Sequence, residues 1–458
     1  MSEKKVSTKT KLSFAIGNIG GLAIGQASIL LLYSYYFLYL KVPLSPIGIS
    51  LILMVYGIWD ALNEPLIGHI SDNTRTRWGR RKPFIIIGMV PLIIFSFLIF
   101  TPPTNDPIAS TVYLVIILIL YETFVTMVVT IWYSLFPEIT LDQNERLSVS
   151  KYLQIFGIFG LIIGTGVAPL IAGMFPEAIV GYSIMGIILG ILTALSMIPT
   201  ILNVKERKEY QIIETDKINF FKSIKILGTN RTFVYFVLIQ FLLQLSYSLV
   251  LTSLPLFFEG ILGMGALEYS IQLLLIFTTV IPGLYLWISI ASKKGTKYAL
   301  FISMIAFCVV FPFVFLVNNP FTILVLLLIA GIGLGGLMLF PTILLSDVID
   351  EDQLTTGKRR EGIYNGMSGV IVKLANAISW LLVGIILTLF QIDRNSLNPS
   401  TISDMNALGL RVLLGALPPI VILLGLLFLH FYPLAGEKLM QVKEKVKILN
   451  EKLVDSKN

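Results

Sequence analysis

Twelve long apolar stretches, separated by short polar ones, make up most of the chain. Most are close to or above the roughly 20 apolar residues that a helix needs to cross a bilayer. A helix satisfies its own backbone hydrogen bonds, which lipid cannot do. The pattern therefore predicts an all-α membrane protein of twelve transmembrane helices, with these approximate spans: 12–40, 46–70, 83–101, 111–136, 151–174, 179–203, 232–258, 269–291, 297–318, 321–347, 362–391 and 406–432.

Basic side chains are distributed very unequally between the polar stretches. If successive spans alternate in direction, 30 of the 34 Lys and Arg residues lie on one side of the membrane. The other side has Lys41, Arg394 and Arg411, and Lys373 lies inside the eleventh span. Because positive residues accumulate in cytoplasmic loops, we expect both termini to be cytoplasmic, in the plasma membrane of a prokaryote. The net charge of +7 follows from this topology and does not indicate nucleic-acid binding.

The longest internal loop divides the spans into six and six. Spans four and ten both end in Phe-Pro, at Phe136 and Phe340, which indicates two related halves. We predict an N-terminal six-helix bundle (1–203), a cytoplasmic central loop (204–231), a C-terminal six-helix bundle (232–432) and a basic cytoplasmic tail (433–458). Two bundles around a central site are a common plan for transporters, and we expect this one to function as a monomer.

The tail carries apolar residues at alternating spacings of three and four. These residues form one stripe on a helix: Leu439, Val442, Val446, Leu449 and Leu453. We expect a basic amphipathic helix that lies on the inner leaflet. A coiled-coil site for a partner is the alternative.

The sequence offers little for catalysis or cofactor binding. It has one cysteine, Cys308, and two histidines, His69 and His430. So few ligands predict neither a disulfide framework nor a tightly bound metal. We find no phosphate loop, dinucleotide fingerprint or nucleophile–base set. The prediction is a protein that is not an enzyme and needs no cofactor.

Ionisable residues inside the spans are expensive unless they are paired or hydrated, so they indicate function. Span two has Asp60, Asn63 and Glu64, with the two carboxylates four residues apart on one helix face. Thr126 of span four can add a hydroxyl oxygen, and Lys373 of span eleven adds a positive charge. Two carboxylates and one lysine leave one net negative charge, which one H⁺ or Na⁺ would neutralise. The alternative is a structural ion pair that joins helices.

The loop between spans two and three combines glycines, a carboxylate and several arginines. One interpretation is a positive anchor at the cytoplasmic surface. The other is a conformational latch, whose carboxylate accepts hydrogen bonds from arginines in one state and releases them in another. The predicted latch residues are Gly68, Asp72, Arg75, Gly79, Arg80 and Arg81.

Two runs of residues together resemble a known family. The first is Trp-Asp-Ala-Leu-Asn-Glu-Pro at 59–65, followed by Ser-Asp at 71–72 and Trp-Gly-Arg-Arg at 78–81. The second is Asp-Val-Ile-Asp at 347–350 and Gly-Lys-Arg-Arg-Glu-Gly-Ile-Tyr at 357–364, followed by Lys373. Both runs are similar to those of the glycoside–pentoside–hexuronide:cation symporters, the melibiose permease-like group of the major facilitator superfamily. The resemblance implies the two-bundle fold of that superfamily.

The resemblance also implies a cation site. Its residues would be Asp60, Asn63, Glu64, Thr126 and Lys373. The family's sugar ligands, two carboxylates, a tryptophan and an arginine, fall here on Gly21, Val129, Tyr133 and Gln154. We therefore expect a different sugar, held by residues from Gln26, Glu122, Trp132, Tyr133, Gln154 and Trp380.

Together these features predict secondary active symport of a sugar or glycoside with H⁺ or Na⁺ by alternating access. The missing sugar ligands leave a cation-coupled carrier of a lipid-like or other non-sugar solute as an alternative. A membrane sensor that binds a solute without moving it is a further one. The expected partners are a small solute and the lipid bilayer, not nucleic acid.

Overall fold

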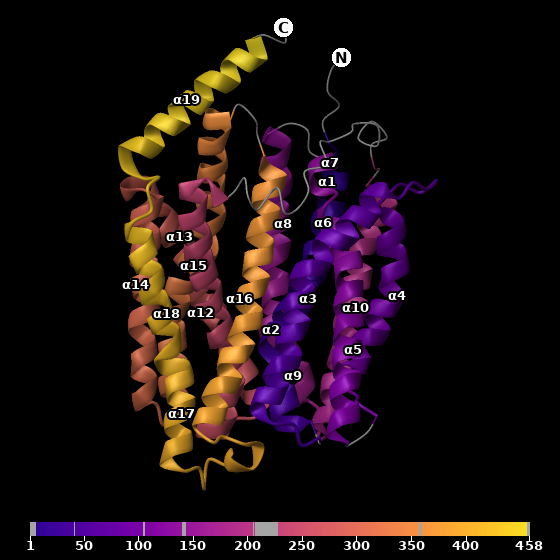
Figure 1. Ribbon diagram of the computed structural model, residues 1–458, viewed down its shortest axis with the longest axis vertical. Helices are drawn as coiled ribbons and strands as arrows, with labels where there is room; N and C mark the ends of the chain where they lie inside the picture. The colour runs from indigo at the N-terminus through magenta and orange to yellow at the C-terminus, as the bar shows by residue number, and fades with distance from the viewer. Residues whose placement is uncertain are drawn as a thin grey trace. The chain divides into compact units, whose positions relative to one another are not determined.

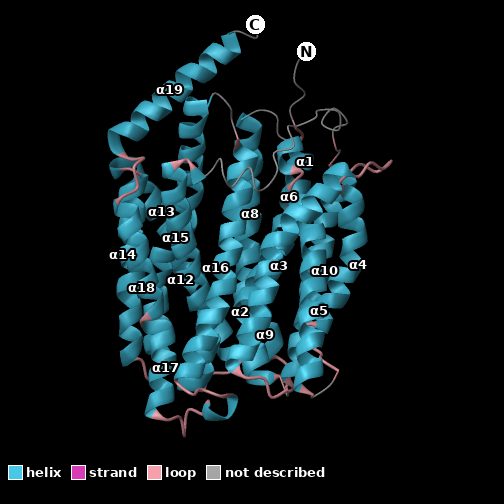
Figure 2. Ribbon diagram, viewed as in Figure 1, coloured by secondary structure: helices cyan, strands magenta, loops and turns pink. Residues whose placement is uncertain are grey.

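The structure is a computed structural model that describes residues 6–40, 42–103, 106–139, 143–204, 206, 228–356 and 360–455. These residues form helices and connecting loops, and they contain no β-strand (Figure 2). The prediction of an all-α protein is confirmed.

Most predicted spans are single α-helices (Figure 1). They are α3 (Pro46–Asn73), α4 (Lys82–Leu98), α10 (Ala178–Asn203), α12 (Arg231–Leu262), α13 (Ala266–Lys294), α15 (Pro320–Thr356) and α16 (Glu361–Leu389). The other spans join shorter elements end to end: α1 (Thr8–Ala15), α2 (Gly17–Ser34) and a π-helix (Tyr35–Tyr39); α5 (Pro107–Val125), a π-helix (Thr126–Thr130) and α6 (Ile131–Tyr133); α8 (Gln143–Ile162), a π-helix (Ile163–Val167) and α9 (Ala168–Gly173); α14 (Thr296–Val310) and a 3₁₀-helix (Phe311–Leu316); α17 (Asp404–Gly415) and α18 (Leu417–His430). Outside the spans lie α7 (Phe136–Ile139), a 3₁₀ turn (Arg394–Ser396) and α19 (Gly436–Asp455).

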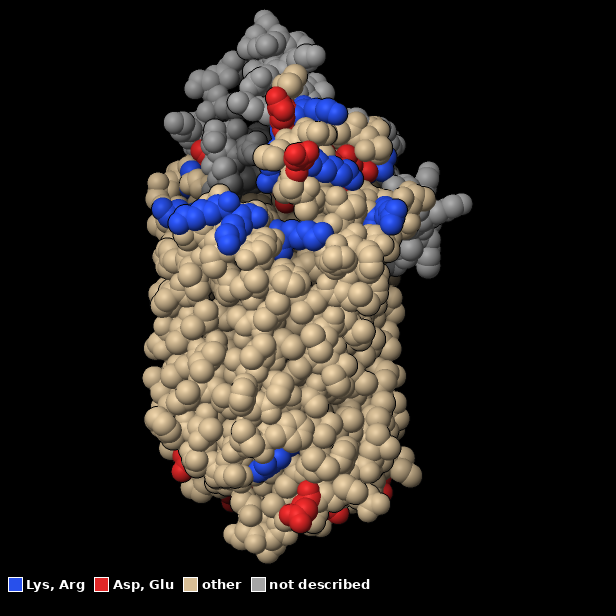
Figure 3. Space-filling view, turned by 90° about the vertical axis from the view of Figure 1, so that its left-hand side faces the viewer, with Lys and Arg blue, Asp and Glu red and all other residues tan. Residues whose placement is uncertain are grey.

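The lengths of these helices agree with a membrane-spanning protein. In the described part of the chain, 11 helical segments are long and apolar enough to cross a membrane. The remaining predicted span is α4, which is apolar and 17 residues long. Figure 3 shows one face of the molecule, where a broad belt without charged side chains is bordered at one end by Lys and Arg.

The chain divides into two compact units that differ from the predicted bundles. Unit 1 comprises Met1–Lys217, Leu251–Leu274 and Trp380–Ala407, and unit 2 comprises Ile218–Val250, Leu275–Ser379 and Leu408–Asn458. Unit 1 therefore contains the first six spans together with the end of α12, the start of α13, the end of α16 and the start of α17. Most of the predicted loop at 204–231 lies outside the described residues, so the domain boundary stays a prediction.

Small residues allow the helices of each unit to approach closely, as in other membrane proteins. In unit 1, α2 packs against α8 and α10. A Cβ on Gly160 of α8 would lie 2.5 Å from the carbonyl oxygen of Ile19. In unit 2, α14 packs against α15, where a Cβ on Gly333 would lie 2.6 Å from the backbone nitrogen of Phe307.

The predicted tail helix exists as α19, and it packs against α15. Val442 and Val446 of the predicted stripe are buried. Two ion pairs also join α19 to α15, Lys438 to Glu351 at 2.7 Å and Lys443 to Asp347 at 3.1 Å. These two valines therefore face the protein, where the acidic end of α15 attracts the basic helix. The expected placement of the tail on the inner leaflet stays a prediction. The side chains of Leu449 and Leu453 lie outside the described residues.

Candidate functional site

The membrane-embedded carboxylates of unit 1 lie where α3 packs against α5. Glu122 on α5 is only 5% exposed. It accepts hydrogen bonds from the hydroxyl groups of Tyr56, at 2.8 Å, and Thr126, at 3.5 Å. Asp60 lies one turn from Tyr56 and close enough to act electrostatically on both Tyr56 and Tyr121. Glu122, predicted as a solute ligand, thus lies with Thr126, a predicted cation ligand.

Asn63 joins this cluster and carries an unpaired oxygen. The residue is 1% exposed, and its Nδ2 donates to the backbone oxygen of Glu122 at 3.2 Å. Its Oδ1 is buried and accepts no hydrogen bond from any described residue. Such a buried acceptor costs about 1–3 kcal/mol, and an ion or a water is the usual reason that a protein keeps one. An amide oxygen among carboxylates suits a hard cation.

The helix after α5 is widened where it contacts Glu64. Residues Thr126–Thr130 form a π-helical turn, a feature frequently found at functional sites. Thr126 bonds to Glu122 on one side of this turn, and Thr130 donates to Glu64 Oε1 at 2.8 Å on the other. The predicted residues Asn63, Glu64 and Thr126 are therefore brought to one α3–α5 interface.

Trp380 extends the cluster with an unpaired donor. It belongs to the segment of α16 that lies in unit 1, and it is 2% exposed. Its ring centroid is 5.5 Å from that of Tyr56, which in turn donates to Glu122. Its Nε1 is buried and donates to no described residue. Tyr56 thus contacts both Trp380 and Glu122, two of the predicted solute ligands. The unpaired N–H of Trp380 lies beside the two aromatic rings.

The remaining predicted solute ligands are more dispersed. Trp132 is 1% exposed, stacks on Phe14 at 4.9 Å and donates to the Thr200 hydroxyl at 3.1 Å. This geometry is that of a packing residue. Tyr133 beside it is 53% exposed, and Gln154 is also exposed. Gln26 on α2 is half-buried.

Lys373 lies in unit 2, half-buried on α16. Polar pairs between α12 and α16 flank it along the helix. Ser368 donates to Gln240 at 2.7 Å, and Asn376 accepts from Gln244 at 2.9 Å. The approach of Lys373 to the α3 carboxylates stays a prediction.

In the predicted latch, Asp72 contacts two of the three arginines. Its Oδ1 lies 3.4 Å from Arg80 Nη1 and 3.4 Å from Arg81 Nη2. Arg75 is exposed, and the position of a Cβ on Gly68 is open. Because the Asp72 side chain is 52% exposed, these pairs each contribute only about 0–1 kcal/mol. They are weak enough to break during a conformational change.

The structure adds a second carboxylate to this loop, one that the sequence does not predict. Glu206 accepts the backbone N–H groups of Arg80 at 2.7 Å, Arg81 at 3.1 Å and Lys82 at 2.9 Å. These groups form the start of α4, where negative charge is favourable. Gly79 has a φ of 109°, and a Cβ there would meet the Glu206 carboxylate at 2.5 Å. No local pattern predicts this contact, because Glu206 is 126 residues from Arg80.

The helical spans define a polytopic membrane protein with the major facilitator fold. The chain belongs to the family described as MFS/sugar transport protein, whose profile matches residues 13–436. Relatives and structural neighbours of the chain are transporters rather than enzymes.

Two relatives match almost the whole chain. An uncharacterized symporter of Synechocystis, sll1374, is 25% identical and covers 95% of this chain and 95% of its own. The sodium-dependent lysophosphatidylcholine symporter 1 of Gallus gallus is 26% identical and covers 98% and 91%. Among solved structures, a bacterial homologue of the human lysosomal transporter Spinster, inward-facing and unoccupied, has a TM-score of 0.65 at 13% identity, over 93% and 95% of the two chains. That likeness concerns the fold.

Proposed function

We propose that this protein is a symporter of the glycoside–pentoside–hexuronide:cation type, which moves a sugar or glycoside together with Na⁺ by alternating access. The observation that carries the cation site is the buried, unpaired Oδ1 of Asn63 among membrane-embedded carboxylates. A proton needs only one carboxylate to bind. A metal cation needs several oxygen ligands, and neutral oxygens from an amide and from Thr126 complete such a coordination shell.

In the proposed cycle, Na⁺ is bound by Asn63, Thr126 and the carboxylates of Asp60 and Glu64. Lys373 balances one carboxylate when the cation is absent. Cation binding then removes the charge imbalance and organises the solute site beside it. Because binding free energies are coupled reciprocally, the solute raises the affinity for the cation by the same factor. Since Na⁺ and protons compete for carboxylates, the affinity for Na⁺ should fall as the pH is lowered.

Contacts within unit 1 support a gate for alternating access. At the predicted extracellular end of the helices, the Tyr39 hydroxyl donates to Glu259 of α12. Arg394, which follows α16, donates to the backbone oxygen of Leu40 at 3.0 Å. Thr252 of α12 donates to the backbone oxygen of Ile29 at 3.3 Å. These contacts join the first predicted bundle to segments of the second, and they must break to admit a solute from that side.

The solute site is proposed beside the cation site, at Trp380 and Tyr56. The unpaired indole N–H of Trp380 can donate to a hydroxyl oxygen, and the two rings can stack on the apolar face of a sugar. Tyr133 and Gln154 are proposed as further ligands because their side chains are exposed. The loop with Asp72 and Arg81 is proposed as the latch on the other side.

A lysophospholipid is the second candidate solute. The full-length similarity to a sodium-dependent lysophosphatidylcholine symporter favours it. The same Trp380 N–H can donate to a phosphate oxygen, so the local geometry fits both classes.

Transport by the purified full chain in proteoliposomes tests the proposal. We expect an inward Na⁺ gradient to drive accumulation of one member of a panel of labelled glycosides, and a pH gradient alone to drive none. If only labelled lysophosphatidylcholine accumulates, the solute is a lysophospholipid and not a sugar, and the proposal for the cation site is kept. Accumulation that follows the pH gradient alone would exclude Na⁺ as the coupling ion.

A further inference from the structure

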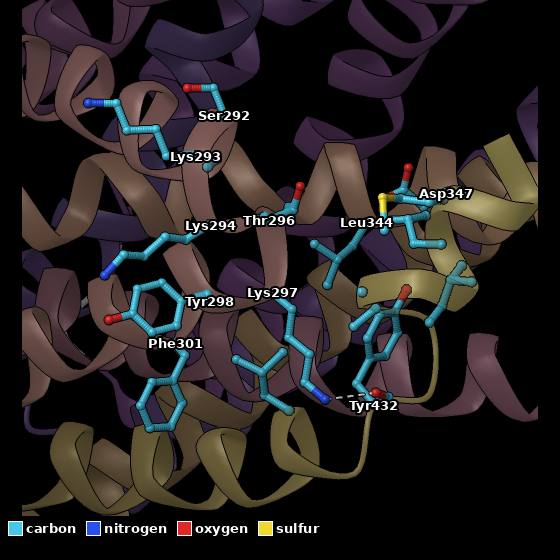
Figure 4. Close-up of a pocket in the computed structure, with 18 of the residues that line it drawn as sticks. Ser292, Lys293, Lys294, Thr296, Lys297, Tyr298, Phe301, Leu344, Asp347 and Tyr432 are labelled. Carbon is cyan, nitrogen blue, oxygen red and sulfur yellow. Dashed lines mark hydrogen bonds between the residues drawn. The ribbon is translucent and has the colours of Figure 1, made fainter. Parts of the chain in front are cut away.

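Unit 2 contains a cavity that the proposed transport cycle does not use. Its volume is about 640 Å³. It is lined by the facing ends of α13 and α14, by α15, by the end of α18 and by the start of α19 (Figure 4). This is the end of the helices that is predicted to be cytoplasmic.

The cavity is positively charged. Lys293 and Lys294 line it, are exposed, and form no ion pair with a described residue. Lys294 lies over the ring of Tyr298, with its Nζ 4.9 Å from the ring centroid. The lining carboxylate of Asp347 is already paired with Lys443 of α19. An anion that enters the cavity would therefore meet positive charge that is not neutralised.

The cavity wall also contains hydrogen-bond donors that a ligand can use. Tyr432, just beyond the end of α18, is only 3% exposed, and its buried hydroxyl has no hydrogen-bond partner among the described residues. A phenol hydroxyl is protonated at neutral pH, so it can donate to a ligand. The first turn of α14 lies in the same wall, and its N-cap Gly295 supplies no side-chain cap. Uncapped N–H groups at a helix start attract phosphate.

Lys297 also lines the cavity and holds two helix ends together. The Lys297 Nζ donates to the backbone oxygens of His430 and Tyr432, each at 2.9 Å. These bonds hold the end of α18 against the start of α14 (Figure 4). They place the Tyr432 ring at the cavity independently of any ligand.

We propose that this cavity binds the phosphate group of an anionic phospholipid from the adjacent membrane leaflet. A lipid fits better than free phosphate because the cavity opens beside an apolar surface. Tyr298 is 42% exposed and Phe301 37% exposed, and Val309 and Phe313 continue exposed apolar surface along the same span. The face in Figure 3 shows Lys and Arg gathered at the edge of the uncharged belt, at the level of lipid headgroups.

The bound lipid would add a contact between α14 and α19. The first turn of α14 and the α19 residues Gly436 and Met440 line the same cavity. The headgroup would therefore reinforce the ion pair that Lys443 of α19 makes with Asp347 of α15. This role is independent of the cation and solute sites in unit 1.

Native mass spectrometry of the full chain, released from nanodiscs that contain phosphatidylglycerol, tests the proposal. The double variant Lys293→Ala, Lys294→Ala should lose about thirtyfold in lipid affinity, at roughly tenfold per 1.4 kcal/mol and about 1 kcal/mol per lysine. The matched control is Lys9→Ala, Lys445→Ala, which removes the same charge from exposed lysines on the same predicted side. It should retain the lipid.

The variant Tyr432→Phe removes only the hydroxyl and should weaken lipid binding about tenfold without unfolding the protein. The proposal is overturned if every variant retains the lipid as well as the unmodified protein does, or if the control loses the lipid to the same extent as the double variant. Inorganic phosphate serves as the soluble competitor. If it displaces the lipid at concentrations near the lipid's own, the site takes free phosphate and the assignment to a lipid is wrong.

Discussion

The substitution Asn63→Leu tests whether the Asn63 side chain binds the cation or has only a structural role. Leucine has the same number of side-chain heavy atoms and the same branch point as asparagine, and it removes the unpaired Oδ1 together with the bond from Nδ2 to Glu122. A buried polar group that contacts a charged partner contributes about 1.5–3 kcal/mol to the binding free energy. The affinity for Na⁺ should therefore fall by about 10- to 150-fold. Without Na⁺, stability should change little, because the variant also removes an unsatisfied acceptor.

The loss of affinity can be measured as a loss of ion-dependent stabilisation. At about 100 times its dissociation constant, an ion stabilises the folded protein by about 2.7 kcal/mol, and after a hundredfold loss of affinity by only about 0.4 kcal/mol. The assay is thermal unfolding of purified protein, monitored by tryptophan fluorescence, over a titration of NaCl against choline chloride. Asn365→Leu is the control, since Asn365 is exposed and donates to the backbone oxygen of Glu361 in its own helix. An unchanged Na⁺ response in Asn63→Leu, or equal destabilisation with and without Na⁺, would refute the reasoning.

Three further substitutions probe the neighbouring residues. Glu64→Gln should abolish accumulation against a gradient and leave downhill exchange, measured with labelled solute in proteoliposomes; a variant that still concentrates solute would contradict coupling through Glu64. Trp380→Phe should keep the packing on Tyr56 but lose the N–H, which weakens solute binding by about tenfold, and unchanged solute binding would remove Trp380 from the site. Gly79→Ala should destabilise the protein by about 1–3 kcal/mol, because it strains the backbone and displaces Glu206; thermal unfolding equal to that of the unmodified protein would exclude this contact.

The fold and part of the site follow from the sequence alone. Hydrophobic spans have a fixed minimum length, so most helices are predicted to within a few residues. Polar ends escape this pattern: α15 continues to Thr356 beyond the predicted end at 347, and α8 begins at Gln143 before the predicted start at 151. The four-residue spacing of Asp60 and Glu64 is enough to place both on one face of α3. Thr126 is predicted beside them from its span, and the spacing also places Glu122 on the same helix face as Thr126. The bond between the two brings Glu122, predicted as a solute ligand, to the cation ligands.

Contacts between distant residues could not be predicted in this way. Glu206 reaches the start of α4 from beyond α10, and Trp380 meets Tyr56 from α16. Both contacts depend on how helices pack, which the hydrophobic pattern of a single helix does not contain. Trp132 and Tyr133 are adjacent in sequence, yet one is buried and the other exposed. The orientation of the helix decides between them.

The most direct test of the central claim is solute uptake under an imposed Na⁺ gradient. The unmodified chain and Asn63→Leu are reconstituted into proteoliposomes, with labelled glycosides and lysophosphatidylcholine offered in parallel. The account predicts that the unmodified chain accumulates one of these solutes only when Na⁺ is higher outside, and that Asn63→Leu requires far more Na⁺ for the same uptake. Accumulation that is equal with and without the Na⁺ gradient would contradict it.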